Sequence, residues 1–244
     1  MNSEVLMIVT AGVFLVALLY SSVGHAGASG YIAVMSVCNL TPEVIKPTAL
    51  VLNVLVATLA TVQFWRAGHF SWRLFWPFAV LSAPLAFVGG WLNLSTPIFK
   101  SLVGLVLLGS AVRFVVRPPV EREPVPVSRP VALGVGGGLG FLSGLTGTGG
   151  GIFLTPLLIW RQWASSKTAA GVSALFILMN SISGLLGHLC ATKLIPQTAW
   201  PLVAAALGGG AIGSQLGSRH FSSTVIKRVL AAVLVVAGIK LLLF

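Results

Sequence analysis

Residues 145–156 read Leu145-Thr-Gly-Thr-Gly-Gly-Gly-Ile-Phe-Leu-Thr-Pro156, and this stretch decides how the fold is interpreted. Four glycines fall within the five residues Gly147–Gly151, inside an otherwise apolar run. Glycine favours a break in a helix at such a point. A short helix that restarts after the break has free backbone N–H groups that can meet an anion. A weaker copy, Gly24-His-Ala-Gly-Ala-Ser-Gly30, lies upstream, so the question is whether the two copies form one site.

The composition is that of an integral membrane protein. Of the 244 residues, 56% are hydrophobic and 8% are charged, whereas soluble domains carry about 25% charged residues. The net charge of +11 comes from 15 Lys and Arg spread over short loops and helix ends. That distribution favours a role in membrane topology over nucleic-acid binding.

Carboxylates are nearly absent from the chain. There is no Asp, and the four glutamates lie near a terminus or in loops: Glu4, Glu43, Glu121 and Glu123. The membrane interior therefore offers no carboxylate to hold a metal ion or relay protons. Acid–base pairs of the usual kind are also missing, so we expect no enzyme, no cofactor and no metal site.

The apolar segments divide the chain into two membrane repeats, residues 1–116 and 130–244, joined by a Pro-rich linker at residues 117–129. The expected segments are 5–22, 31–40, 45–65, 72–92 and 98–116, then 130–145, 152–160, 169–189, 198–216 and 225–244. Segments 31–40 and 152–160 are too short to cross a bilayer, which takes about 20 helical residues.

The second repeat resembles the first at matched positions. Gly24 and Gly27 align with Gly147 and Gly150 at an offset of 123 residues, and residues 48–50 align with residues 173–175 at an offset of 125. Internal duplication of this kind is common in secondary transporters.

The basic residues favour one of two topologies. If each glycine break lies within one bent spanning helix, the two sides of the membrane receive eight and seven basic residues. If each break is the tip of a re-entrant hairpin, the counts are eleven and four, which fits the positive-inside rule better. The sequence therefore predicts an all-α polytopic membrane protein with two inverted repeats. Each repeat has a re-entrant or broken helical hairpin plus three transmembrane helices, with the linker in the cytoplasm and both termini outside.

The hairpin tips would enter from opposite faces and meet near the midplane, where irregular backbone must line a cavity or be buried in protein. The N–H groups of residues 25–29 and 148–151 would then face a bound anion. The predicted substrate-binding residues are Gly24, His25, Ala26, Gly27, Ser29, Thr48, Asn53, Gly147, Thr148, Gly149, Gly150, Gly151, Ser173 and Asn180. Close helix packing is the alternative reason for the glycines.

Two roles are possible for each of several polar residues. The asparagines Asn53 and Asn180 either donate to the anion or hold the broken backbone. Lys46 and Lys167 either collect anions at the two mouths or anchor helix ends at the interface. His25 either changes charge near neutral pH or makes a plain hydrogen bond.

The second glycine stretch, from Gly147 to Pro156 and the two leucines that follow, resembles the signature of the TauE/SafE sulfite exporter family, also called the toluene sulfonate uptake permease family. Residues 23–31 and 46–53 are similar to the first half of a common branch, although Ala26 and Ala28 stand where glycines would be expected. The resemblance implies a plasma-membrane transporter of sulfur-containing anions such as sulfite or sulfonates.

We therefore expect a bacterial-type inner-membrane secondary transporter for small sulfur oxyanions that works by alternating access. An anion channel with the same site as its selectivity filter is the alternative, and a membrane-embedded partner subunit is a third. The expected partners are the sulfur oxyanion and the lipid bilayer, without nucleic acid, and the sequence leaves homo-oligomerisation open.

Overall fold

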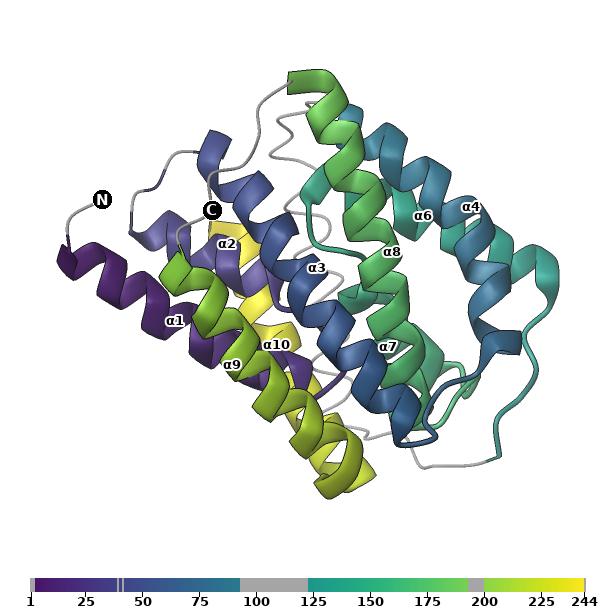
Figure 1. Ribbon diagram of the computed structural model, residues 1–244. Coiled ribbons are helices and arrows are strands. Elements are labelled where there is room, and N and C mark those ends of the chain that lie inside the picture. The colour runs from purple at the N-terminus through teal and green to yellow at the C-terminus, as the bar shows by residue number, and fades with distance from the viewer. Residues whose placement is uncertain (1–2, 39, 41, 93–122, 193–199, 244) are drawn as a thin grey trace.

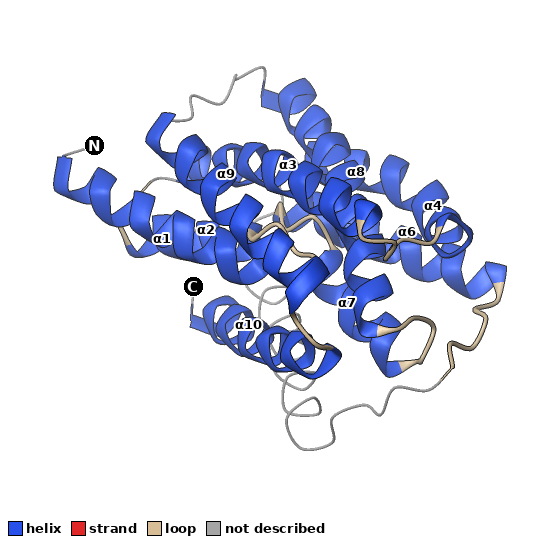
Figure 2. Ribbon diagram, turned by 60° about the horizontal axis from the view of Figure 1, so that its bottom comes forward, coloured by secondary structure: helices blue, strands red, loops and turns tan. Residues whose placement is uncertain are grey.

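A computed structural model describes residues 3–38, 40, 42–92, 123–192 and 200–243. All regular structure in these ranges is helical (Figure 2). The elements are α1 (Ser3–Ser21), α2 (Ala28–Val37), α3 (Pro42–Arg66), α4 (Trp72–Trp91), α6 (Arg129–Thr146), α7 (Gly151–Trp160), α8 (Ser166–Thr192), α9 (Trp200–Gln215), the π-helix η1 (Leu216–His220) and α10 (Ser223–Leu243). The predicted span 98–116 lies outside the described residues.

Helix length separates spanning helices from short ones. Within the described ranges, α1, residues Val44–Arg66 of α3, α4 and α8 are long and apolar enough to cross a membrane. Helices α2 and α7 have 10 residues each, which corresponds to about 15 Å and confirms the two short pieces. Helix α1 has 19 residues and is about 28 Å long, whereas about 15 Å is enough to reach the middle of a bilayer.

Both predicted helix breaks are present, and glycine makes them possible. Helix α6 ends at Thr146, and Gly147 adopts a left-handed conformation with φ 72°. Gly149 and Gly150 both have φ 78°. In the first break, Gly24 and Gly27 have φ 76° and 101°. Because L side chains rarely adopt such angles, only glycine takes these positions without strain.

Helices α3 and α8 cross side by side at the centre of the molecule and run in opposite directions (Figure 1). The side-chain register shows the same antiparallel order. The paired positions along the crossing are Lys46 with His188, Asn53 with Ser181, and Phe64 with Gly171. These helices occupy equivalent places in the two halves of the sequence.

The long arm of each hairpin packs on a helix of the other half. Helix α1 lies against α9, and α6 lies against α4, and both pairs run parallel. Glycines make these contacts close: Gly136, Gly140 and Gly144 abut the carbonyls of Phe78, Ser82 and Ala86, while Gly209, Gly213 and Gly217 abut those of Phe14, Leu18 and Ser22. Small residues at every fourth position let membrane helices approach closely, and these six glycines have that role.

One end of the molecule brings together the α3–α4 turn, the start of α8 and η1. The carbonyl of His69 abuts Gly171. Burial and the nearby ammonium of Lys167 lower the pKa of the His69 imidazole, which is hydrogen-bonded to the backbone of Ser218. The described end of the linker joins this region, where the Val125 N–H donates to the carbonyl of Gln162 at 2.7 Å.

We expect Gly140→Ala to lower the free energy of unfolding by about 1–3 kcal/mol, because an added Cβ would overlap the carbonyl of Ser82. Denaturant titration in detergent with tryptophan fluorescence measures this loss. Gly138→Ala is the matched control on the same helix, since a Cβ there meets nothing within 4 Å. Equal losses in the two variants would contradict close packing between α4 and α6.

Candidate functional site

The two helix starts that follow the glycine breaks meet at the amide of Asn53 on α3. Its Oδ1 accepts from the N–H of Ala28, the first residue of α2, at 3.0 Å. Its Nδ2 donates to Ser181 Oγ on α8 at 3.1 Å. A Cβ on Gly149 would lie 2.7 Å from Asn53 Nδ2 and 3.0 Å from Ser181 Oγ, so the second break packs directly on this amide.

A second contact joins the halves through the first break. His25 Nε2 lies 2.8 Å from Thr155 Oγ1 on α7, within hydrogen-bond distance. His25 is 2% exposed, and its Nδ1 has no partner among the described residues. The imidazole of one half therefore contacts the short helix of the other half inside the protein.

The start of α7 has free donors around it. No side chain caps this helix at Gly150. A Cβ on Gly150 would lie 3.2 Å from Ser143 Cβ and 3.4 Å from Asn180 Nδ2. Ser143 and Asn180 are 1% and 0% exposed, and their Oγ and Nδ2 have no partner among the described residues. Ser82 Oγ donates to Asn180 Oδ1 at 2.8 Å, which leaves the amide nitrogen for the α7 side.

The start of α2 is arranged differently, because polar side chains near it bond to one another. Ser29 Oγ donates to the Tyr20 hydroxyl at 3.3 Å, and the Tyr31 hydroxyl donates to the carbonyl of Ala26 at 2.5 Å. With Asn53 bound to Ala28, the first break is filled by groups of the protein itself.

The remaining predicted residues are buried but more dispersed. Gly24 packs on the carbonyl of Ala170 in the first turns of α8, and Gly147 packs on Lys46 in the first turns of α3. These two glycines therefore lie near opposite ends of the α3–α8 pair. Thr48, Thr148, Ser173, Gly27 and Gly151 are buried, and Ser173 Oγ has no partner among the described residues.

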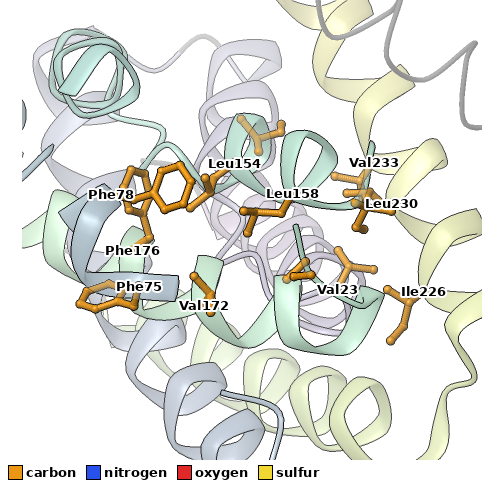
Figure 3. Close-up of a cluster of buried hydrophobic side chains, with 14 of the residues drawn as sticks. Val23, Phe75, Phe78, Leu154, Leu158, Val172, Phe176, Ile226, Leu230 and Val233 are labelled. Atoms are coloured by element: carbon orange, nitrogen blue, oxygen red, sulfur yellow. The ribbon is translucent and has the colours of Figure 1, made fainter. Parts of the chain in front are cut away.

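Apolar packing fixes the position of α7. Leu154 and Leu158 lie between Phe78 and Phe176 on one side and α10 residues such as Leu230 on the other (Figure 3). Val23 of the first break belongs to the same buried cluster. Buried side chains from both halves of the chain therefore hold α7 in position.

Sequence reasoning missed several residues that shape this region, namely Tyr20, Tyr31, Ser82, Ser143, Thr155 and Ser181. The tyrosines carried a usable signal, since they are the only two in the chain and both flank the first break. The Ser and Thr residues carried less, because single hydroxyls are common in membrane helices and often bond to their own backbone. The structure describes no group of three or more His, Cys, Asp or Glu that could hold a metal ion.

The match to a known family covers nearly the whole chain. The sequence model of the family described as "Sulfite exporter TauE/SafE" matches residues 9–241. The chain belongs to this family. A "Probable membrane transporter protein y4hK" of Sinorhizobium fredii is 40% identical over 94% of this chain and 95% of its own length. A "Probable membrane transporter protein YjnA" of Bacillus subtilis is 25% identical over 96% of this chain and 98% of its own length. The protein is therefore a membrane transporter of the TauE/SafE family, which confirms the resemblance inferred from the glycine stretches.

We expect Thr155→Val to lower the free energy of unfolding by about 1–3 kcal/mol, because it leaves His25 Nε2 buried without its partner. Thr155→Ser keeps a hydroxyl at the same place and should keep most of the stability. Thermal unfolding in detergent compares the two variants. If serine and valine cost the same, the hydrogen bond between the halves has no stabilising role.

Proposed function

We propose that the protein carries small sulfur oxyanions, sulfite or an organosulfonate, across the plasma membrane by alternating access. The observation that supports this most is the start of α7, where an uncapped helix N-terminus lies beside the buried donors of Ser143 and Asn180. Helix N-termini attract anions through their N–H groups and macrodipole. No described carboxylate lies nearby to favour a cation instead.

A basic side chain, Lys46, also lies beside the second glycine break. The stem of Lys46 packs on Gly147, with its Cγ 3.4 Å from the position of an added Cβ. A half-buried ammonium next to the break offsets the charge of a bound anion more strongly than it would in water. Sulfite and sulfonates fit such a site because they present three oxygens on a compact anionic centre, and the family's description names sulfite.

For the mechanism we propose two inverted repeats that rock against each other around the anion. The antiparallel crossing of α3 and α8 supports this, since these helices are equivalent in the two halves. The exchange of hairpin arms supports it as well, because α1 packs on α9 and α6 packs on α4. A site formed by the two tips would then face each side of the membrane in turn.

We place the linker in the cytoplasm and both termini outside. The end of the molecule at which the linker joins α6 carries most of the described basic residues, which are Arg66, Arg73, Arg129, Arg161, Lys167 and Arg219. Lys46 lies at the other end of α3. This bias follows the positive-inside rule. Helix α10 ends on the side where α1 begins, which is consistent with both termini on one face (Figures 1 and 2).

Gly149→Ala should lower the uptake of radiolabelled sulfite into proteoliposomes by about a hundredfold. Its Cβ would lie 2.6 Å from Ile177 Cγ2 and 2.7 Å from Asn53 Nδ2, so the backbone at the proposed site must move. Gly68→Ala is a matched control for backbone strain, because Gly68 has φ 79° but open space around it. Unchanged sulfite flux in Gly149→Ala would refute the proposed site.

The same proteoliposomes distinguish a carrier from a channel. Saturable flux with counterflow of unlabelled sulfite is expected for a carrier, whereas single-channel currents would identify a pore. Transport by the purified chain alone would exclude a role as a mere partner subunit.

Lys46→Gln should raise the KM for sulfite by about tenfold or more with a smaller effect on the maximal rate, because the charge acts on the bound anion. Lys46→Arg should keep the KM near that of the unmodified protein. Arg129→Gln removes one exposed charge at the start of α6 and is the control for net charge. A KM that rises equally in Lys46→Gln and Arg129→Gln would indicate general attraction of anions to the surface rather than a local contact.

A further inference from the structure

We infer that the transporter binds a single anion at the start of α7, whereas the start of α2 is a structural counterpart that binds none. This inference rests on the proposed function and restricts it to one of the two glycine breaks. It differs from the sequence-based expectation that both tips donate to the substrate.

The backbone donor of the first residue of α2 is already used. The Ala28 N–H is bound by Asn53 Oδ1 at 3.0 Å, which is the usual role of an asparagine side chain at a helix start. The amide nitrogen of Asn53 is held by Ser181 at 3.1 Å. An anion at this end would have to displace a buried amide that is bonded at both of its polar atoms.

The aromatic rings near the first break leave little space. A Cβ on Gly27 would meet the Tyr31 ring at 3.0 Å, and a Cβ on Gly30 would lie 3.4 Å from the ring of Tyr20. Both hydroxyls are hydrogen-bonded inside the protein, to Ser29 and to the carbonyl of Ala26. Space in the first break is therefore limited, and both tyrosine hydroxyls there are already hydrogen-bonded, while His25 Nδ1 has no partner among the described residues.

The same positions in the second half carry different side chains. At the offset of 123 residues that aligns the glycines, Tyr20 corresponds to Ser143 and Tyr31 corresponds to Leu154. The large ring of Tyr20 is thus replaced by a small hydroxyl, and the second hydroxyl is absent. The two breaks therefore differ in the side chains that line them.

The donors at the start of α7 need a partner that the described residues do not supply. Ser143 Oγ and Asn180 Nδ2 are buried beside Gly150 and have no partner among the described residues. Leaving a buried donor unpaired destabilises the folded protein. All of these groups donate and none carries negative charge, so the chemistry that satisfies them is an oxyanion with several acceptor oxygens.

Removing one free hydroxyl tests the assignment. Isothermal titration of the full chain in nanodiscs, with sodium sulfite and separately with sodium ethanesulfonate, should give about one anion per chain. Ser143→Ala should weaken binding by about tenfold or more, since it removes one hydrogen bond to a charged ligand. It should change the melting temperature without ligand by less than about 2 °C, because the hydroxyl has no partner to lose.

Tyr31→Phe is the matched variant at the other break. It deprives the Ala26 carbonyl of its donor, so the melting temperature should fall by about 2–4 °C, while anion affinity stays within about threefold. If Tyr31→Phe weakens anion binding as much as Ser143→Ala does, or if two anions bind per chain, the inference is wrong.

Asn180→Asp supplies an independent readout. A carboxylate at the start of α7 would occupy the place of the anion, so the melting temperature without ligand should rise toward that of the sulfite-saturated protein. Added sulfite should then give no further shift. A variant that melts earlier and still responds to sulfite would overturn the assignment. If the unmodified protein binds neither anion, the proposed substrate class fails first and the inference falls with it. Binding by the unmodified protein with no loss in Ser143→Ala refutes the inference alone.

Discussion

Backbone N–H groups that are freed by a helix break inside a membrane must find partners, and the rest of this structure depends on that constraint. Each break frees the N–H groups at the start of a ten-residue helix. At α2 the protein supplies the partner from Asn53, a residue on the adjacent long helix. At α7 the N-cap residue is Gly150, which has no side chain to cap the helix. The two breaks have similar backbones, and they differ in the groups that lie at the start of the following helix.

Close packing at glycines stabilises the helices next to each break. Gly144 lets α6 approach α4 at Ala86, and Gly213 lets α9 approach α1 at Leu18. These contacts join each long arm to a helix of the opposite half, and those helices, α9 and α4, pack in turn on α3 and α8. This packing matters at the site, since unpaired donors such as Asn180 Nδ2 would relax toward other partners in a loosely packed protein.

Much of the fold followed from the sequence because its signals are local. Apolar length predicted the long helices, and clustered glycines predicted both breaks, with the end of α6 and the start of α7 each within one residue of the predicted 145 and 152. The exchange of arms between the halves could not be predicted in this way. It depends on which glycines meet which carbonyls across the molecule, as Gly140 meets Ser82, and no periodicity within one helix records the partner.

Glycines and asparagines stand out in an apolar chain, so Gly149, Asn53 and Asn180 could be proposed as site residues from the sequence. The duplication also suggested that the two tips would act alike, whereas we infer that they differ. A repeat conserves the backbone, whereas function is set by side chains that diverge, as Tyr20 and Ser143 do at matched positions. The Tyr20 hydroxyl accepts a hydrogen bond from Ser29 within the first break. The buried Ser143 hydroxyl has no partner among the described residues and can donate a hydrogen bond to an anion.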